Sequence, residues 1–329
     1  MSENAHVTEP NPLDSSALTF ACPICPERPV LLVKETALAC EICGASFPLA
    51  RGVPILINDR NSVFSIADYA VGQSYAGDAY GKASDGVRGW RRAYHRFASR
   101  LSGHAVARQY LGSKQAVAII QSRIERARIL VIGAGDTVYE GKAKIVYTDV
   151  AFSPNVACIC DAHDLPFPNG YFDAVIAVAV MEHVAEPVRC AVEIWRVLRP
   201  QGFVYSTTPF LQPVHMGAYD FTRFTYLGHR RLFRYFDDVE SGIALGPGAT
   251  IAWSVQYLLL SFSDRRWYRR ISRLLGLIMT FPLKYLDYLA SDTRSAYDAA
   301  GGFYFLGQRR DAPISDRDLI KLYRGGIAS

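Results

Sequence analysis

The chain has 329 residues, of which 50% are hydrophobic, 12% aromatic and 20% charged, so it can bury a substantial core and is not a disordered polypeptide. Its formal net charge is only +5 at pH 7, and its length allows about two domains, or one elaborated α/β domain with a small appendage, which excludes a larger multi-domain assembly. The longest apolar stretches, 251–262 and 274–283, are shorter than the roughly 20 residues that span a bilayer, so we expect no membrane-spanning helix.

Residues 1–18 are expected to form a flexible leader. Residues 1–16 are polar and acidic, without the basic start and apolar run of a secretory signal. We therefore expect a cytoplasmic protein, and a place at the inner face of the membrane is left open.

Two Cys-x-x-Cys pairs form the first motif, with fourteen residues between them. A tight turn lets two sulfurs separated by two residues bind one tetrahedral ion, and two such turns fill all four positions. The pattern predicts a structural zinc ribbon over 19–58, with a hairpin of strands at 30–33 and 36–39. Redox-active dithiols are the alternative. The segment 47–57 resembles the end of the small Trm112-type ribbon that accompanies some methyltransferases. Beyond this motif the sequence indicates no second set of metal ligands. The predicted zinc ligands are Cys22, Cys25, Cys40 and Cys43.

Residues 59–127 are expected to connect the ribbon to the main domain. Residues 57–86 are rich in Ser, Gly, Ala, Asp and Tyr, which is typical of a loosely packed linker. Residues 90–126 carry apolar residues at helical spacing and predict two or three helices. Because 88–128 holds ten Lys or Arg residues against one acid, we expect a local basic surface.

From residue 128 onward, short apolar runs alternate with helical segments. This alternation predicts repeated βα units and a doubly wound, mostly parallel sheet of the α/β class. Residues 302–307 predict a further strand, expected as the antiparallel edge of the sheet. The four predicted parallel strands are 129–132, 145–147, 174–179 and 203–207.

A glycine turn follows the first of these strands directly. In Gly133-Ala134-Gly135 the small side chains let backbone amides approach a ligand at a helix N-terminus. Asp149 ends the second strand, where a carboxylate can accept hydrogen bonds from two ribose hydroxyls. Only thirteen residues separate Gly135 from Asp149, fewer than the roughly 20 usual for a dinucleotide loop, so the first helix must be very short or distorted.

Four more motifs follow in order: Asp161-Ala-His-Asp-Leu-Pro-Phe167, Tyr171-Phe-Asp-Ala-Val-Ile176, Met181-Glu-His183 and Val197-Leu-Arg-Pro-Gln-Gly202. With the glycine turn and Asp149, this series resembles the class I S-adenosylmethionine-dependent methyltransferases of the type 11 group, over 129–236. The resemblance implies a Rossmann-like domain that binds S-adenosylmethionine across the carboxyl ends of the strands. Carried over by position, the cofactor residues are Gly133, Ala134 and Gly135 for the methionine part, Asp149 and Val150 for the ribose, Asp161, Ala162 and His163 for the adenine, and Ala179, Met181 and Glu182 near the methyl donor.

Two features of the cofactor region depart from the family pattern. Val131 stands where many members have an acidic residue, and the first helix is short. A degenerate domain that binds no cofactor is therefore an open alternative. Asp161 also has a local alternative, because an Asp in such a loop commonly caps nearby backbone amides.

The acceptor is expected to arrive at residues 215–225. His215 is the candidate general base because its unperturbed pKa lies near 6.5. Tyr219, Asp220 and Arg223 are candidates to orient it or to hold an anionic group, unless Asp220 and Arg223 merely form an ion pair that braces the loop. The segment resembles a type 11 subgroup found among proteins of surface-polysaccharide assembly, which implies a sugar hydroxyl or similar acceptor.

Several arginines separate the apolar stretches 251–262 and 274–283. This makeup suits an amphipathic helix on an anionic membrane or a lid over the acceptor pocket, and we favour the lid. The methyltransferase domain is assigned to 128–312, with an acceptor or lid insertion at about 208–295 and a tail at 313–329.

The sequence therefore predicts an enzyme that transfers a methyl group from S-adenosylmethionine to a hydroxyl of a small-molecule or glycan acceptor, which can be lipid-linked. An RNA methyltransferase is a less favoured alternative, in which the ribbon and the basic segment 88–128 bind RNA. A non-catalytic scaffold with a decayed cofactor site is a third. Peripheral membrane contact and a homo-oligomer are left open.

Overall fold

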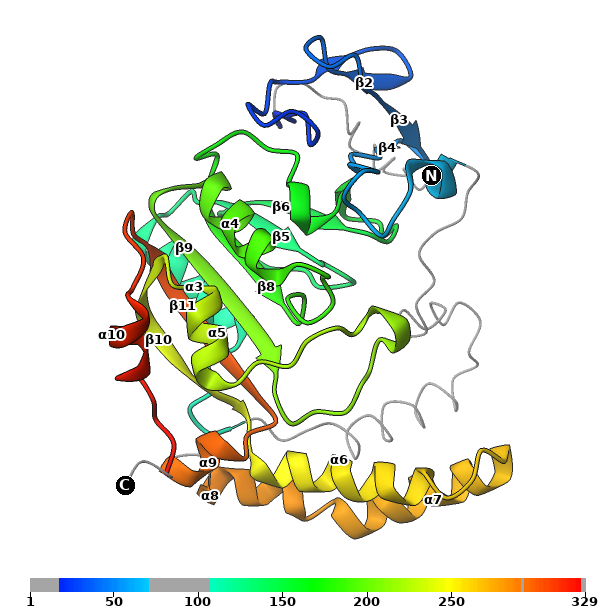
Figure 1. The fold of residues 1–329 in the computed structure, drawn as a ribbon, viewed down its shortest axis with the longest axis vertical. Coiled ribbons are helices and arrows are strands. Elements are labelled where there is room, and N and C mark those ends of the chain that lie inside the picture. Colours follow the sequence, from blue (N-terminus) through cyan, green and yellow to red (C-terminus); the bar gives the residue numbers. More distant parts are fainter. Residues whose placement is uncertain (1–17, 71–106, 291–292, 327–329) are drawn as a thin grey trace, which may run out of the picture.

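The computed structural model describes residues 18–70, 107–290 and 293–326 (Figure 1). A small sheet of four strands lies at one end of a larger sheet of seven strands, and a pair of long helices lies at the other end. Part of the predicted connector, including much of the basic segment 88–128, falls outside the described residues.

The four-stranded sheet forms the N-terminal ribbon. Neighbouring strands are antiparallel, and Leu32 lies opposite Ala39 in the first pair, so the predicted hairpin is confirmed. Leu38 and Phe47 are buried between this sheet and the main domain. The strands are β1 (Leu32–Val33), β2 (Ala37–Ala39), β3 (Ser46–Ala50) and β4 (Val53–Pro54).

The large sheet has the strand order β10-β11-β9-β8-β5-β6-β7. The five strands from β7 to β9 in this order run parallel, whereas β11 is antiparallel to both β9 and β10. The predicted doubly wound, mostly parallel fold is therefore confirmed. The strands are β5 (Arg128–Ile132), β6 (Lys144–Asp149), β7 (Val156–Ile159), β8 (Phe172–Val178), β9 (Leu198–Pro209), β10 (Phe236–Leu245) and β11 (Gly302–Arg309).

The edge of the sheet differs from the expectation. Strand β11 is antiparallel as predicted, but it lies inside the sheet because β10 pairs along its outer side. Residues 236–245 fall within the predicted insertion, so that insertion is interrupted by a strand of the core. The charged residues Asp237, Asp238 and Glu240 obscure the strand pattern in the first half of β10, where an edge strand tolerates them.

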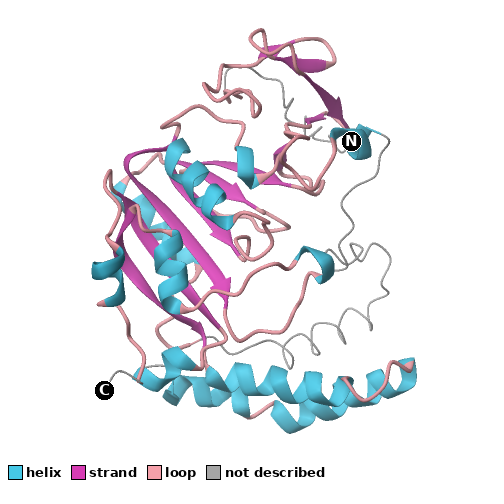
Figure 2. Cartoon of the chain, viewed as in Figure 1, coloured by secondary structure: helices cyan, strands magenta, loops and turns pink. Residues whose placement is uncertain are grey.

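Helices cover both faces of the large sheet (Figure 2). The inner strand β5 shows why both faces are covered: Ile129 and Val131 pack with α3 (Ser113–Arg123) on one face. Leu130 and Ile132 join the cluster of α4 (Pro187–Val197) and α5 (Tyr226–Leu232) on the other. The remaining short helices are α1 (Ile66–Ala70), α8 (Asp287–Ala290), α9 (Arg294–Asp298) and α10 (Asp316–Ile320), and 3-10 turns occur at Ala162–Asp164, Gly217–Tyr219 and Leu283–Leu286.

Two long helices, α6 (Pro247–Leu260) and α7 (Arg266–Thr280), pack together as a hairpin at the end of the molecule opposite the ribbon (Figure 1). The hairpin contacts the residue just before the predicted acceptor segment, where the Tyr257 hydroxyl donates a hydrogen bond to the Val214 carbonyl at 3.2 Å. Among the described helices, none has both the length and the apolar character needed to cross a bilayer.

Candidate functional site

A pocket lies at the carboxyl ends of β5, β6 and β8, where the predicted cofactor residues meet. Gly133 follows β5, Asp149 ends β6 and Ala179 follows β8. Because these strands are parallel neighbours, their carboxyl ends meet at one edge of the sheet, where ligands of such folds bind. The predicted cofactor residues that line the pocket are Gly133, Asp149, Val150, Asp161, Ala162, His163 and Ala179.

Other predicted residues lie behind this lining. Ala134 and Gly135 belong to the turn itself, and Met181 and Glu182 are fully buried residues of the loop that follows β8. None of the described residues that line this pocket comes from α6 or α7, so the prediction of a lid over the acceptor site is not tested by it.

The turn after β5 is built without the expected helix. The described segment 133–143 contains turns but no helix, because its eleven residues leave little room between β5 and β6. The Asp149 carboxylate holds the turn instead: its Oδ2 accepts a hydrogen bond from the Gly135 amide at 2.8 Å. Gly133 has φ +63°, and a Cβ there would lie 2.7 Å from Cγ2 of Val180. Only glycine fits this cradle.

Asp149 has the geometry expected of a residue that binds a sugar. Its side chain is buried but lines the pocket, and its Oδ1 accepts a hydrogen bond from the Ala151 amide at 3.0 Å. A carboxylate has about four acceptor positions, so both oxygens can accept further hydrogen bonds from a ligand. The turn and the carboxylate together fit a ribose-bearing cofactor.

The side chains of Asp161 and His163 form hydrogen bonds with neighbouring residues of the protein. Asp161 caps the turn by accepting hydrogen bonds from the backbone amide and ring Nδ1 of His163, and from Ser62. Burial acts to raise the pKa of Asp161, but the His163 hydrogen bonds outweigh burial and lower it. His163 Nε2 in turn accepts from the Glu186 amide at 2.9 Å. The side-chain contacts of Asp161 are therefore those of a residue that caps a nearby backbone amide, which the sequence left as an alternative.

The first described part of the connector packs against the pocket, contrary to the expectation of a loose linker. Val63 and Phe64 line the pocket, and the Phe64 ring stacks on Tyr219 with centroids 5.8 Å apart. The Tyr69 hydroxyl donates to the Val150 carbonyl at 2.6 Å. No helical or strand periodicity marks 59–65, so the sequence carries no signal for this contact.

The acceptor loop contains the Asp220–Arg223 ion pair that the sequence left as one alternative. Arg223 forms a two-point ion pair with Asp220 and donates to the carbonyls of Gln212 and Pro213. Burial acts to raise the pKa of Asp220, but the Arg223 hydrogen bonds lower it to about 2. Asp220 also accepts from the His215 amide at 2.9 Å. The brace thus fixes the position of His215.

His215 faces two residues of the loop that follows β8. Its Nε2 lies 3.0 Å from Nε2 of His183, and Glu182 Oε1 lies within 3.8 Å of both atoms. His183 also lines the pocket. Burial lowers the pKa of both histidines, and burial raises the pKa of Glu182 to about 8. The sequence motifs named these residues separately, but β8 and β9 bring them together.

The four ribbon cysteines converge on one point. Sγ of Cys22 lies 3.7 Å from that of Cys43, and Sγ of Cys25 lies 3.8 Å from that of Cys40. All four sulfurs lie within 4.8 Å of one another. Zinc–sulfur bonds of ~2.3 Å in a tetrahedron give sulfur separations of ~3.8 Å, so the site fits zinc.

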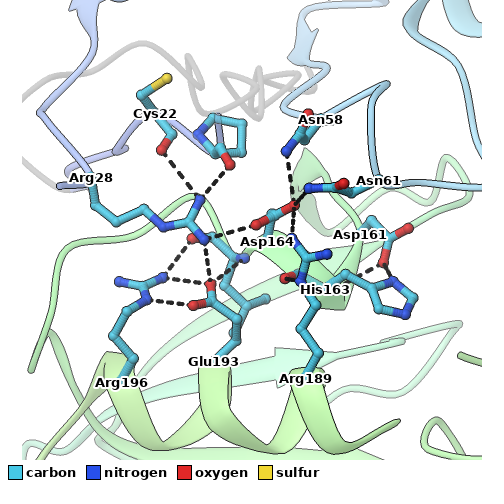
Figure 3. Close-up of polar contacts among 12 residues, drawn as sticks. Cys22, Arg28, Asn58, Asn61, Asp161, His163, Asp164, Arg189, Glu193 and Arg196 are labelled. Atoms are coloured by element: carbon cyan, nitrogen blue, oxygen red, sulfur yellow. Dashed lines mark hydrogen bonds and ion pairs between the residues drawn. The ribbon is translucent and has the colours of Figure 1, made fainter. Parts of the chain in front are cut away.

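A buried polar network joins the ribbon to the loop beside the pocket (Figure 3). Arg28 of the ribbon forms ion pairs with Asp164 and Glu193. Asp164 also accepts hydrogen bonds from Asn58 and Arg189. The ribbon is thereby anchored at Asp164, the residue that follows His163.

The sequence matches a known family over part of its length. Residues 140–206 match the type 11 methyltransferase family model, described as a methyltransferase domain. Over 72 residues the chain is 36% identical to the ubiquinone/menaquinone biosynthesis C-methyltransferase UbiE of Ralstonia nicotianae. That alignment covers 21% of this chain and only 29% of the relative. The large sheet is accordingly a Rossmann-like methyltransferase fold preceded by a four-cysteine cluster.

Solved structures with similar folds are more distant. The 1,6-didemethyltoxoflavin-N1-methyltransferase of Burkholderia thailandensis, solved with its substrate and S-adenosylhomocysteine, is 12% identical with a TM-score of 0.39, over 85% of this chain and 98% of that one. Haemonchus contortus phosphoethanolamine N-methyltransferase 2, solved with S-adenosyl-L-methionine, is 17% identical with a TM-score of 0.37, over 69% of this chain and 61% of that one.

Proposed function

We propose that the chain is a methyltransferase that uses S-adenosylmethionine and methylates a hydroxyl of a small-molecule or glycan acceptor. One observation carries the proposal: the pocket at the glycine turn and Asp149 adjoins the loop that holds His215. When bound, S-adenosylmethionine supplies a methyl group already activated on a sulfonium. The family match over 140–206 supports the same chemistry.

The residues of the chain then have distinct tasks. Asp149 and the turn at Gly133 bind the sugar and methionine parts, and the rings of Phe64 and Tyr219 shield the pocket from water. His215 receives the proton of the acceptor hydroxyl, because burial lowers its pKa and leaves the ring neutral near pH 7. Asp220 and Arg223 position His215 rather than contact the acceptor.

Two finer assignments belong to the same proposal. The acceptor loop resembles that of proteins in surface-polysaccharide assembly, which favours a glycan hydroxyl, lipid-linked or free. The ribbon is of the Trm112-like type and binds one zinc ion with Cys22, Cys25, Cys40 and Cys43, which the sulfur geometry supports.

Calorimetry with S-adenosylmethionine tests the cofactor site on the zinc-loaded chain. Asp149→Asn should weaken binding at least tenfold while preserving side-chain volume, because a ligand hydroxyl loses a charged acceptor. Asp136→Asn is the matched control, since Asp136 is an exposed carboxylate in the same turn. Binding that is absent from the wild type would instead favour a scaffold protein, and equal affinity in Asp149→Asn would refute the ribose assignment.

Methyl transfer from labelled cofactor to glycans, to quinol-like phenols and to RNA tests the acceptor. Label in a glycan oxygen is the expected result. Label on a carbon atom would instead indicate a C-methyltransferase, as the Ralstonia relative is named. Label in RNA, with salt-dependent binding, would favour the nucleic-acid alternative.

We also propose that the α6–α7 hairpin docks on an anionic membrane, near a lipid-linked acceptor. Helix α7 has three stripes: small buried side chains against α6, exposed apolar side chains, and exposed arginines. An amphipathic helix lies in a membrane interface with its apolar side down and its cationic side near anionic lipid. The apolar stripe is Trp267, Ile271, Leu274, Leu275, Ile278 and Met279, and the exposed arginines are Arg266, Arg270 and Arg273.

Vesicle sedimentation separates the occupants of this surface. The wild type should bind vesicles that contain phosphatidylglycerol, with a blue shift of Trp267 fluorescence, and bind neutral vesicles weakly. Leu274→Ser with Ile278→Ser should lose binding to both, whereas Arg270→Gln with Arg273→Gln should lose the preference for anionic lipid. A dimer that these serine changes dissociate, without lipid binding by the wild type, would show that a second copy covers the face.

A further inference from the structure

A cluster of possible metal ligands lies beside the pocket and far from the ribbon cysteines. Glu182 and His183 lie on the loop after β8, and His215 lies on the loop after β9. The two histidine Nε2 atoms are 3.0 Å apart, and Glu182 Oε1 lies 3.7 and 3.8 Å from them. One nitrogen or oxygen from each residue therefore faces a common point.

A hydrogen-bond acceptor lies behind the imidazole ring of each histidine, on the side away from that point. His183 Nδ1 lies 2.9 Å from the Tyr219 carbonyl oxygen, which can only accept, so Nδ1 carries the proton and Nε2 carries a lone pair. Behind the other ring, His215 Nδ1 lies 3.4 Å from Asp220 Oδ2. Two ring nitrogens 3.0 Å apart must share either a proton or a cation. Carbonyl or carboxylate acceptors behind imidazoles are also the usual second shell of histidine metal ligands.

Glu182 provides an independent sign that a ligand is missing. Its side chain is 0% exposed, and neither carboxylate oxygen accepts a hydrogen bond from another described residue. Burying such a group without a partner is costly. Arg223 lies on the facing loop, but its guanidinium is engaged with Asp220 and with backbone carbonyls. A bound cation would give the carboxylate a partner.

We propose that Glu182, His183 and His215 bind one divalent transition-metal ion. Two imidazoles with one carboxylate favour ions such as Fe²⁺, Co²⁺ or Zn²⁺ over Mg²⁺ or Ca²⁺, which prefer oxygen ligands. Three protein ligands leave coordination positions open, and His183 also lines the pocket, so an acceptor oxygen can reach the ion.

The catalytic consequence rests on the proposed function, whereas ion binding does not. With the ion bound, both Nε2 lone pairs are occupied, and the ion lowers the pKa of a coordinated acceptor hydroxyl in place of a histidine base. The hydroxyl proton leaves to water. The carbon–oxygen bond to the methyl group then forms as the carbon–sulfur bond of the donor breaks, which releases the neutral thioether.

Cobalt titration of the full chain tests the site. The ribbon is first loaded with zinc, which its soft thiolates retain, and other metal is removed by dialysis. Calorimetry and visible absorption should then detect one Co²⁺ per chain without thiolate charge-transfer bands. Glu182→Gln, His183→Ala and His215→Ala should each weaken binding at least tenfold. Glu186→Gln is the matched control, because Glu186 is an exposed carboxylate near the cluster.

The outcomes separate the ion site from the methyltransferase proposal. Failure of the zinc-loaded chain to bind Co²⁺, or equal affinity in Glu182→Gln, which keeps the shape of the side chain, would overturn the ion site. S-adenosylmethionine binding is measured on the same samples. Cofactor binding without Co²⁺ leaves the proposed function standing and refutes the ion, whereas Co²⁺ binding without cofactor supports the ion and refutes the proposed function.

Discussion

Arg28 of the ribbon donates a hydrogen bond to Asp164 beside the cofactor pocket, with Nη2 and Oδ1 2.8 Å apart and both side chains at most 10% exposed. Arg28 lies between the two cysteine pairs, and Asp164 ends the turn that Asp161 and His163 cap. Because these charges are buried, we expect unfolding of the ribbon to loosen the pocket loop as well.

Removal of zinc should loosen the pocket loop as well as the ribbon. On the proposed zinc site, folding of the ribbon is coupled to metal binding, so chelation should unfold 19–58 and withdraw Arg28 from Asp164. Hydrogen exchange is expected to accelerate at 160–165 and to recover when zinc is restored. Arg28→Met, which keeps the ribbon metal, should cost about 1–3 kcal/mol, because Asp164 keeps Arg189 and Asn58 as partners. A rate of hydrogen exchange at 160–165 that does not change on chelation would contradict the coupling.

Gly133→Ala should damage the cofactor pocket more than a comparable change elsewhere. The new Cβ would combine a left-handed backbone with an approach of 2.7 Å to Val180, so we expect a loss of about 2–4 kcal/mol of stability and weaker cofactor binding. Gly44→Ala is the control, since Gly44 has φ +71° but nothing within 4 Å, and it should cost only about 1–2 kcal/mol. Equal losses of stability in urea unfolding would show that the close approach is unimportant.

The elements that the sequence predicted well are those with local patterns. Ile129, Leu130, Val131 and Ile132 form an unbroken apolar run because both faces of β5 are buried. The spacing of the cysteines likewise predicts that their four sulfurs lie close together. The glycine turn and Asp149 also come from adjacent parallel strands, so their meeting in one pocket follows from the predicted topology.

The features that the sequence did not predict depend on long-range packing. Phe64 reaches Tyr219 across the pocket from a segment without periodicity, and nothing local indicates that contact. The pairing of His183 with His215 is different, because β8 and β9 are parallel neighbours and both residues follow their carboxyl ends. A systematic comparison of the residues after neighbouring strands would have found this cluster.

The buried imidazole of His229 should make stability fall as the pH is lowered. Burial, with the Arg230 charge second, lowers the pKa of His229 to about 3, whereas an unfolded histidine titrates near 6.5. Below pH 6.5 the unfolded chain therefore binds a proton that the folded chain refuses, and stability drops by up to ~1.4 kcal/mol per pH unit from this group. Above that pH the group has no effect.

His229→Gln isolates this contribution from any acid sensitivity of the proposed zinc site. The amide can keep a hydrogen bond to Ser206, which lies 3.1 Å from His229 Nε2, but it does not titrate. Urea unfolding at about pH 7 and about pH 5 should show a smaller loss in the variant than in the wild type. Parallel losses would mean that His229 accepts a proton in the folded state.

The stacked rings of Phe64 and Tyr219 connect the ribbon side of the pocket to the acceptor loop, so we expect them to contribute to cofactor binding. Their planes are only 8° apart, and both residues line the pocket. Phe64→Ala should weaken S-adenosylmethionine binding about tenfold, since the truncation opens the pocket to water and removes aromatic contact of ~1 kcal/mol or more. Phe64→Tyr should restore most of the affinity because it keeps the ring. Phe64 is half-buried at the surface of the core, so the unfolding midpoint of Phe64→Ala should change little. A variant that loses stability and affinity together, without rescue by tyrosine, would assign Phe64 to packing alone.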